Sequence, residues 1–376
     1  MIQSIKIANY KSIHRADVQL NNLNILIGQN GAGKSNFISF FKFLERLSEQ
    51  QLATYIFQSG GINNFLHKGF EESQEIRFKL TLKSNESILT NIFETQIISD
   101  GENYTINLEK FGVRDESNVN QPIYYYELNN QQKESDLKTF ANQNLKQHEN
   151  RFAKYTYIHL KELKLYHFHD TSDNAAIKLP QPKDDVYFFK NEGQNLAPYL
   201  SFIKNADYNS YLKIVETIRL VFPSFHDFVL EENPYAKGKI VLRWKEKSSE
   251  NIYSVKQMSD GTLRFICLAI LLTDTLANNN QPETIILDEP ELGLHPFAIH
   301  ILAELIQKAA LNRQIIIATQ SVNLINHFTP KDLLIVERNE KDQTIFKRVE
   351  EENFNNWLED YTLGQLWENN FFGGRP

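Results

Sequence analysis

The sequence predicts an α/β fold with a mixed sheet, in which a parallel core lies beside an antiparallel β-lobe and a helical insertion. Three observations lead to this prediction. A glycine-rich loop at 28–35 stands between an apolar run and a helix-like stretch. Segments with alternating apolar and polar residues follow the loop at strand spacing. Near the carboxyl end, residues 284–318 show the order strand, helix, strand, which is typical of a βαβ unit and favours a parallel sheet buried on both faces.

The amino-terminal part of the chain is predicted to be rich in strands. Apolar residues at alternating positions indicate two strands within 2–20, and Leu23–Ile27 forms a third that leads into the glycine-rich loop. A helix is expected over 36–47. Three further alternating segments predict an antiparallel sheet, at 76–82, 92–98 and 104–108.

The middle of the chain is predicted to contain a polar insertion, followed by amphipathic helices and then short strands. Residues 115–150 are polar and rich in Asn and Gln, so we expect an exposed, partly helical insertion. Helical spacing over 196–222 predicts one or two amphipathic helices that stop at Pro223. Short strands are expected at 228–230, 240–244 and 252–255, followed by an apolar helix at 261–276. We therefore predict three segments: an amino-terminal lobe at 1–110, an insertion with a mixed lobe at 111–255, and a carboxyl-terminal lobe at 256–376.

Composition restricts the class of protein. The chain has 376 residues, with Lys+Arg 40 against Asp+Glu 47, so its overall charge does not attract nucleic acid or an anionic membrane, although a local basic groove remains open. The single cysteine, Cys267, lies in an apolar run, which excludes a disulfide framework or a Cys₄ zinc site and fits a cytoplasmic location. The sequence shows no signal-peptide pattern and no apolar run of about 18 residues, so no membrane span is expected.

The glycine-rich loop has the composition of a phosphate-binding Walker A motif. Its glycines let backbone N–H groups turn inward around phosphates, Lys34 reaches the β- and γ-phosphates, and the Ser35 hydroxyl is a ligand for Mg²⁺. ATP and Mg²⁺ are therefore the expected ligands. The residues predicted to bind the nucleotide are Asn30, Gly31, Gly33, Lys34, Ser35 and Asn36.

Two acids end the strand predicted at 284–287, as in a Walker B motif. Asp288 is placed to orient Mg²⁺, and Glu289 is placed to polarise the water that attacks the γ-phosphate. Taken alone, these acids would equally fit a solvated strand end. The Walker A motif upstream favours the catalytic interpretation.

The segment Met258-Ser259-Asp260-Gly261-Thr262 precedes the predicted apolar helix. A serine hydroxyl and glycine amides at a helix N-terminus suit a γ-phosphate, and Ser259 and Gly261 are the residues expected to contact it. The same residues also form an ordinary helix cap. The order of the motifs favours the phosphate-binding interpretation: Walker A, this signature segment, Walker B, then Pro290–Pro296 and Ala318–Ser321.

In this order the motifs resemble those of RecF-like and SMC-like ABC ATPases of the AAA_21 type, and the resemblance covers nearly the whole chain. It implies an ABC-type P-loop head that hydrolyses ATP and forms a homodimer, or a higher homo-oligomer, around the nucleotide. It also implies a switch or clamp that regulates a separately encoded effector, a nuclease or toxin, in phage defence or genome maintenance. Gln320 occupies the switch position. Glutamine can hydrogen-bond a phosphate or water but cannot shuttle a proton, so slow hydrolysis is expected.

Other interpretations stay open. The chain could be a DNA-binding clamp in repair or recombination, or a scaffold that assembles with ATP and hardly hydrolyses it. A basic, aromatic stretch at 146–164 favours nucleic-acid contact or a solvated surface. His167, His169 and Asp170 suggest a metal cluster or simple packing. The aromatic residues of 353–372 predict either a core helix or a docking surface for another protein.

Overall fold

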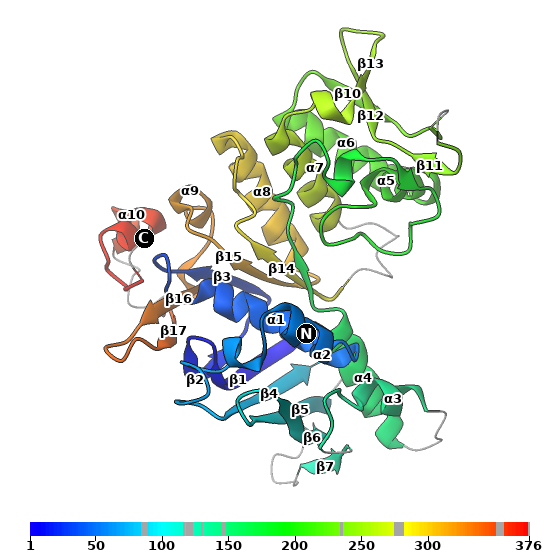
Figure 1. The fold of residues 1–376 in the computed structure, drawn as a ribbon. Coiled ribbons are helices and arrows are strands. Elements are labelled where there is room, and N and C mark those ends of the chain that lie inside the picture. Colours follow the sequence, from blue (N-terminus) through cyan, green and yellow to red (C-terminus); the bar gives the residue numbers. More distant parts are fainter. Residues whose placement is uncertain are drawn as a thin grey trace. The chain divides into compact units, whose positions relative to one another are not determined.

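The computed structural model describes residues 1–83, 89–115, 117, 123–128, 131–143, 148–233, 236–273, 282–350 and 357–374. The chain forms two compact units, and its elements are labelled in Figure 1. The first unit comprises Met1–Lys164, Pro282–Ile286 and Thr329–Pro376. The second comprises Leu165–Gln281 and Leu287–Phe328. The division into three segments made from the sequence stays a prediction.

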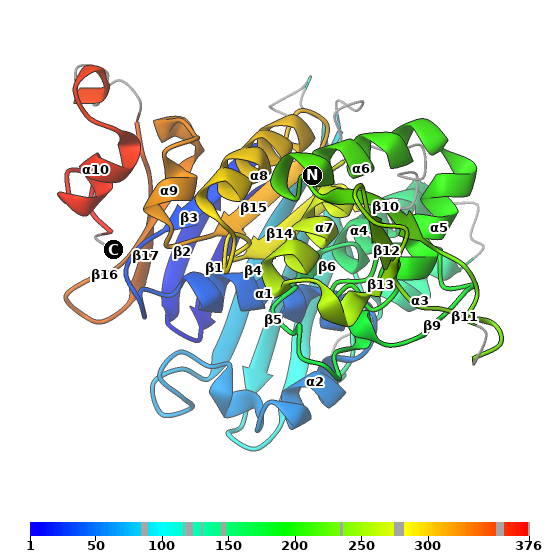
Figure 2. The same cartoon turned by 90° about the horizontal axis from the view of Figure 1, so that it is seen from above.

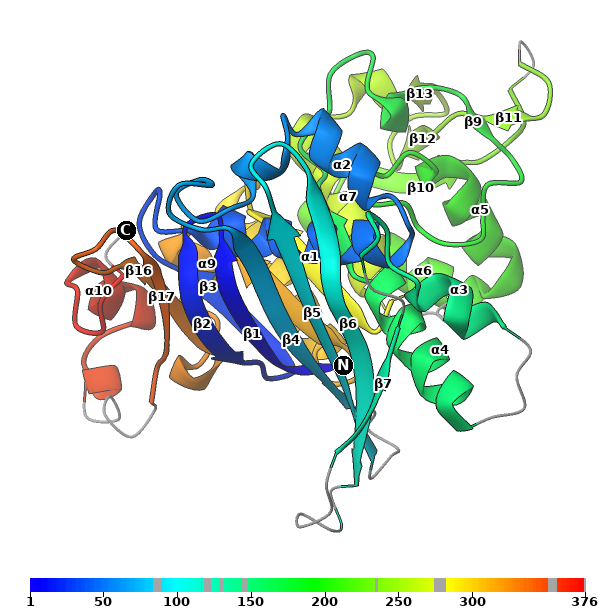
Figure 3. The ribbon, with the colours of Figure 1, turned by 60° about the horizontal axis from the view of Figure 1, so that its bottom comes forward.

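A six-stranded antiparallel sheet dominates the first unit, with the strand order β2-β1-β4-β5-β6-β7 (Figure 3). Its strands are β1 (Ile2–Tyr10), β2 (Ile13–Gln19), β4 (Glu75–Lys83), β5 (Leu89–Ser99), β6 (Tyr104–Asp115) and β7 (Tyr124–Glu127). Alternate residues of β4 are buried, as expected for a sheet with one face against a core. This confirms the predicted antiparallel lobe.

Helix α1 (Lys34–Ser48) packs on the buried face of this sheet, behind the strands in Figure 3. Phe40 and Phe43 contact Phe78 of β4 edge to face, with ring centroids 5.3 and 6.4 Å apart, and both also contact Tyr10 of β1. Each fully buried Phe side chain stabilises the fold by about 1.5–3 kcal/mol. The helix therefore begins at a fixed place relative to the sheet, and the glycine-rich loop that precedes it is held at that place.

A second group of strands in the first unit has the order β17-β16-β3. Strand β3 (Leu23–Ile27) is wholly buried and pairs in parallel with β16 (Leu333–Arg338), with Leu26 opposite Leu334. Strand β17 (Thr344–Arg348) returns antiparallel to β16. This hairpin was not predicted from the sequence. The unit also contains the helices α2 (Leu52–Gln58), α3 (Leu137–Asn142), α4 (His148–Lys161) and α10 (Leu363–Glu368), and the 3₁₀ helices Ile62–Asn64, Pro330–Asp332 and Trp357–Glu359.

The second unit is mainly helical. Its helices are α5 (Leu196–Ala206), α6 (Tyr208–Val221), α7 (Asp260–Leu272), α8 (Pro296–Ala309) and α9 (Val322–Ile325), with 3₁₀ helices at Ala176–Lys178 and Val255–Gln257. Its strands are β9 (Gln181–Pro182), β10 (Phe225–Val229), β11 (Lys239–Ile240), β12 (Arg243–Glu246), β13 (Ile252–Ser254) and β15 (Gln314–Ala318). Strands β8 (Lys164–Tyr166) and β14 (Thr284–Asp288) run from the first unit into the second. Viewed from above, α8 lies over the wholly buried β15 (Figure 2).

Most predicted elements are confirmed, including two helices where one or two were expected at 196–222. The polar insertion differs in part from the prediction, because Leu137 and Ala141 of α3 are buried and not exposed. Its residues Asn118, Asn120, Asn129, Asn130, Asn144 and Lys146 lie outside the described residues, as do 274–276 of the predicted apolar helix. Cys267 is buried in α7, and burial raises the pKa of its thiol. Of the helices described, none is both long and apolar enough to cross a membrane.

Candidate nucleotide site

The glycine-rich loop follows β3 and contains two positions that exclude a side chain. At Gly28, a Cβ atom would lie 2.1 Å from the carbonyl oxygen of Val336 on β16. At Gly33, φ is 118°, and a Cβ atom would lie 2.2 Å from Thr344 Oγ1 on β17. Glycine alone fits both positions, since it has no Cβ and adopts positive φ at little cost. The β16–β17 hairpin therefore requires these two glycines of the motif.

The same hairpin holds the loop by hydrogen bonds. Arg338 Nε donates to the carbonyl of Gly31 at 2.9 Å, and Thr344 Oγ1 donates to the carbonyl of Ala32 at 2.8 Å. A trans peptide places its N–H opposite its C=O, so the Gly33 N–H points away from Thr344. The hairpin thus orients the loop peptides before any ligand binds.

Lys34 is the first residue of α1 and is buried. Its Nζ donates to the carbonyl of Gly28 and, at 3.2 Å, to that of Gln29. The ammonium group therefore lies against the loop backbone. Within the described chain, no side chain caps the N-terminus of α1. A positive helix end beside a buried ammonium group is an arrangement that attracts a polyphosphate.

The remaining loop residues predicted to bind the nucleotide differ in their surroundings. Asn30, Gly31 and Ser35 are exposed. Asn36 is half-buried, and its Nδ2 donates to Ser12 Oγ at 2.7 Å, in the turn between β1 and β2. The side-chain nitrogen of Asn36 is thus already used within the protein. Its contact with a nucleotide stays a prediction, as do the contacts of the other three residues.

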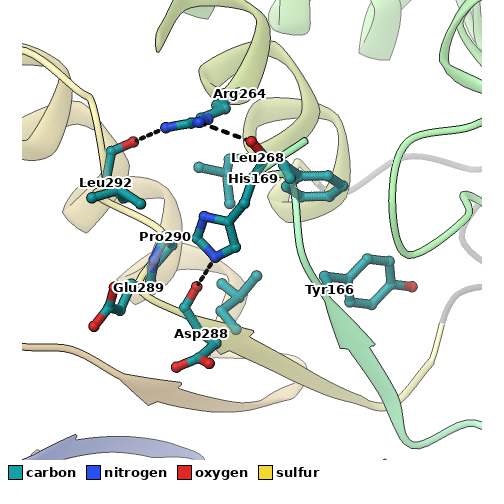
Figure 4. Close-up of a pocket in the computed structure, with 10 residues that line it drawn as sticks. Tyr166, His169, Arg264, Leu268, Asp288, Glu289, Pro290 and Leu292 are labelled. Carbon is teal, nitrogen blue, oxygen red and sulfur yellow. Dashed lines mark hydrogen bonds between the residues drawn. The ribbon is translucent and has the colours of Figure 1, made fainter. Parts of the chain in front are cut away.

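The two predicted Walker B acids, Asp288 for Mg²⁺ and Glu289 for catalysis, lie at the end of β14 in the second unit (Figure 4). Glu289 has φ of 45°, a left-handed conformation that costs energy for a residue with a side chain. Its N–H donates to the carbonyl of Ala318 at the end of β15, at 2.8 Å. Gln320 Nε2 donates to Glu289 Oε1, also at 2.8 Å. The structure therefore brings two of the predicted catalytic side chains, Glu289 and Gln320, into direct contact.

Glu291 is a further acid near Glu289, and it was not predicted from the sequence. Thr319 Oγ1 donates to its Oε1, while Oε2 is buried and has no hydrogen-bond partner among the described residues. Burial raises the pKa of this carboxyl to about 7, and the charge of Glu289 acts in the same direction. The strand end thus combines Glu289 with an acid whose pKa lies near neutral pH.

Arg264 lies on α7, the helix that follows the signature segment, and its contacts link this helix to the end of β14 (Figure 4). One of its terminal nitrogens donates to the carbonyl of Leu292 at 3.0 Å and the other to the carbonyl of His169 at 2.9 Å. His169 Nε2 in turn donates to the carbonyl of Asp288 at 3.1 Å. These contacts form a continuous chain from α7 to Asp288. These contacts could not be predicted from the sequence, because Arg264 and His169 do not share a recognisable motif there.

The signature residues lie at the start of α7. Ser259 is exposed and caps the helix, because its Oγ accepts from the Thr262 N–H at 3.1 Å. Gly261 lies against the loop after β14, where a Cβ atom would be 2.5 Å from the carbonyl oxygen of Gly293. Lys178 Nζ contacts Asp260 at 3.2 Å and is the largest cause of the lowered pKa of that carboxyl. The helix-cap interpretation of Ser259 is confirmed, and its role toward a nucleotide stays a prediction.

The structure bears on two other candidate sites, a metal cluster and a nucleic-acid contact; the second stays a prediction. Among the residues that the structure describes, no group of three or more His, Cys, Asp or Glu side chains is arranged to hold a metal ion. His167 and His169 follow β8 and do not lie within a strand. In the basic stretch, Tyr157 is buried and donates to Glu49 Oε1 at 2.8 Å, and Lys164 pairs with Glu45. These two residues are engaged within the protein and are not free to contact a nucleic acid.

Comparisons with known proteins identify the family and the fold. The model of the AAA_21 family, described as "AAA domain, putative AbiEii toxin, Type IV TA system", matches residues 23–326. No curated protein gives a match. A solved SMC head bound to the C-terminal winged-helix domain of ScpA is similar over 94% of this chain and 98% of its own, with a TM-score of 0.61 and 12% identity. An SMC head from Pyrococcus furiosus with an extended coiled coil, bound to the C-terminal domain of ScpA, is similar over 96% and 98%, with a TM-score of 0.59 and 12% identity. At this identity the likeness establishes the fold.

Proposed function

Because this chain belongs to the AAA_21 family, we propose that it binds ATP and hydrolyses it to ADP and phosphate, and that nucleotide-dependent dimerisation makes it a switch for a partner effector protein. The observation that carries the proposal is the phosphate loop. Gly28 and Gly33 are required by the surrounding hairpin, and Lys34 is buried against the loop carbonyls at the uncapped start of α1. This arrangement is suited to a polyphosphate.

Hydrolysis is assigned to the end of β14. Glu289 orients the attacking water and accepts its proton as the water oxygen bonds to the γ-phosphorus and the bond to the β–γ bridging oxygen breaks. Gln320 fixes the Glu289 carboxylate through its hydrogen bond at 2.8 Å. An amide holds the carboxylate but cannot accept a proton from it, which supports slow turnover.

The residues predicted to hold Mg²⁺ offer oxygen donors, the hydroxyl of Ser35 and the carboxylate of Asp288, which match the preference of this ion. Asp288 is half-buried at the end of β14, and Ser35 is exposed in the first turn of α1. When bound, the ion would neutralise charge on the β- and γ-phosphates. Lys34 neutralises charge on the same groups from the protein.

Dimerisation is proposed from the signature residues. Ser259 is exposed at the start of α7, and in a dimer it would approach the γ-phosphate bound by a second copy, together with the amide of Gly261. ATP would then favour the dimer, and loss of the γ-phosphate would remove that preference. The similar SMC heads are bound to domains of ScpA, which supports a partner protein here. We propose a separately encoded effector, a nuclease or toxin, acting in phage defence.

The solution mass of Glu289→Gln, measured by light scattering with and without Mg-ATP, tests the dimer. The amide should keep nucleotide binding and block hydrolysis, so a doubled mass is expected only with Mg-ATP. Glu216→Gln, which alters an exposed carboxylate on α6, is the matched control and should hydrolyse ATP like the unmodified protein. A mass that ignores nucleotide would contradict the proposed dimerisation. Full biological activity of the ATPase without any partner gene would contradict the effector.

Two alternatives remain. Glutamine at the switch position, Gln320, favours a scaffold that assembles with ATP and scarcely hydrolyses it, because an amide cannot shuttle a proton. Single-turnover measurements would identify such a scaffold by bound ATP that persists for hours. The alternative of a DNA clamp in repair or recombination predicts salt-dependent, ATP-stimulated binding to DNA ends.

A further inference from the structure

Three aromatic rings gather near the carboxyl end of the chain, in the part of the first unit drawn in red in Figure 1. Trp357, Tyr361 and Phe371 are 44%, 41% and 43% exposed. The Trp357 ring lies 4.8 Å from that of Phe371 and 6.0 Å from that of Tyr361. We call these three residues the aromatic patch. Contiguous exposed apolar surface is a feature of interaction sites, whereas single exposed apolar residues are ordinary.

The segment that carries the patch is anchored by buried side chains and hydrogen bonds. Leu366 and Trp367 of α10 are fully buried, and Trp367 Nε1 donates to the carbonyl of Gly374. The Gly374 N–H donates to Glu337 Oε1 on β16 at 2.7 Å, and the Phe371 N–H donates to the carbonyl of Leu366 at 2.9 Å. The rings are therefore carried by an anchored segment. Because they stay half-exposed, the fold does not gain the full stabilisation that burying them would give.

The charged side chains within the segment that carries the patch, residues 357–374, are all acidic. Glu359, Asp360 and Glu368 are exposed, and none of them forms an ion pair with any described residue. The stretch 357–374 contains no Lys or Arg; Arg375 follows it in the sequence, and Lys347 on β17 pairs with Glu337, the residue that binds the Gly374 N–H. Aromatic faces and carboxylates both attract cations, and a guanidinium group suits both because it stacks on rings and pairs with carboxylates through two hydrogen bonds.

We propose that the aromatic patch docks an arginine-bearing peptide segment of a separate protein. The proposal rests on the proposed function only in assuming that a partner exists. Residues 357–374 lie beyond the region 23–326 that the family model matches. The same acidic charge disfavours nucleic acid, an anionic lipid surface and the patch of a second copy, which would all be repelled.

The test is a selection from a phage-displayed library of random 12-residue peptides on the full-length protein, without nucleotide. The enriched peptides should contain an excess of Arg, and one of them, labelled with fluorescein, then reports affinity by anisotropy. Trp357→Ala combined with Phe371→Ala should weaken binding at least about tenfold, the loss expected for a central aromatic anchor. Glu359→Gln combined with Asp360→Asn should weaken it severalfold and remove most of its dependence on salt.

Phe57→Ala is the matched control, because Phe57 is an exposed ring, 84% accessible, on α2 of the same unit and outside the patch. It should bind the peptide unchanged. Tyr361→Ala is a second patch variant, used if the double variant melts at a lower temperature. No enrichment, enriched peptides without excess Arg, or equal binding by the patch variants would overturn the proposal. Glu289→Gln should still bind the peptide, so failure of docking and failure of the proposed hydrolysis are separate results.

Discussion

Replacing Glu291 with glutamine should make the stability of the protein less dependent on pH. The pKa of this carboxyl is about 7 in the folded protein, against 4.5 for the ordinary side chain, and burial is the largest cause. Below about pH 4.5 the group is protonated in both folded and unfolded states. Between 4.5 and 7 the unfolded chain releases the proton and the folded protein keeps it, so stability falls as pH rises.

The size of this effect follows from the difference between the two pKa values. At about 1.36 kcal/mol per pKa unit, that difference costs the folded protein up to about 3 kcal/mol once pH exceeds 7. The residue as a whole is half-buried, but the Oε2 atom is fully out of solvent, so we take about 3 kcal/mol as an upper limit. In Glu291→Gln the neutral amide can accept the Thr319 hydroxyl and carries no proton to lose.

Urea unfolding at about pH 5 and about pH 8, followed by circular dichroism, measures this effect. The stability of the Gln variant relative to the unmodified protein should rise by roughly 2–3 kcal/mol between the two pH values. Glu216→Gln, at an exposed position on α6, should show no such rise and serves as the control. A Glu291→Gln variant with the same pH dependence as the unmodified protein would refute the argument that burial holds the proton on Glu291.

Three further outcomes are expected. Gly33→Ala should weaken ATP binding roughly 10- to 100-fold by calorimetry, because the new Cβ would lie 2.2 Å from Thr344 Oγ1 and φ is 118°; an unchanged affinity would contradict the tight contact with the hairpin. Gln320→Ala should lower the rate of hydrolysis roughly 10- to 100-fold with little change in ATP affinity, since it frees the Glu289 carboxylate; equal losses in rate and affinity would contradict a role limited to positioning. Arg264→Met keeps an unbranched apolar stem but removes the guanidinium group and with it both carbonyl contacts, and should lower stability by about 2–3 kcal/mol in thermal unfolding; a melting temperature equal to that of the unmodified protein would show that those carbonyls find other partners.

The phosphate loop shows which structural features can be predicted from residues that are close along the chain. The spacing of Gly28, Gly33 and Lys34 and the flanking apolar strand and helix were sufficient to predict the loop and its neighbours. The physical reason is that these features are local: backbone conformation and helix capping depend on residues a few positions apart. The hairpin that holds the loop comes more than 300 residues later, with Arg338 and Thr344 donating to loop carbonyls. Nothing in the local pattern of either segment indicates that pairing.

Glu291 and Arg264 show the opposite case. Each is an ordinary charged residue in sequence, and only packing gives it a distinct environment. Glu291 acquires its raised pKa from burial beside Glu289, and Arg264 connects two loops that are separated along the chain by more than 100 residues. Tyr157 likewise matched a stacking residue by composition, whereas the fold buries its ring and uses its hydroxyl to bind Glu49.

By itself, the sequence determined the α/β class, the antiparallel lobe, the phosphate loop and the acids that end β14, because each depends on periodicity or on residues that are close along the chain. Only the tertiary structure decided that Gln320 contacts Glu289, that burial raises the pKa of Glu291, and that the rings of Trp357, Tyr361 and Phe371 gather on one surface. Those properties arise from burial and from contacts between distant segments, and a one-dimensional pattern contains neither.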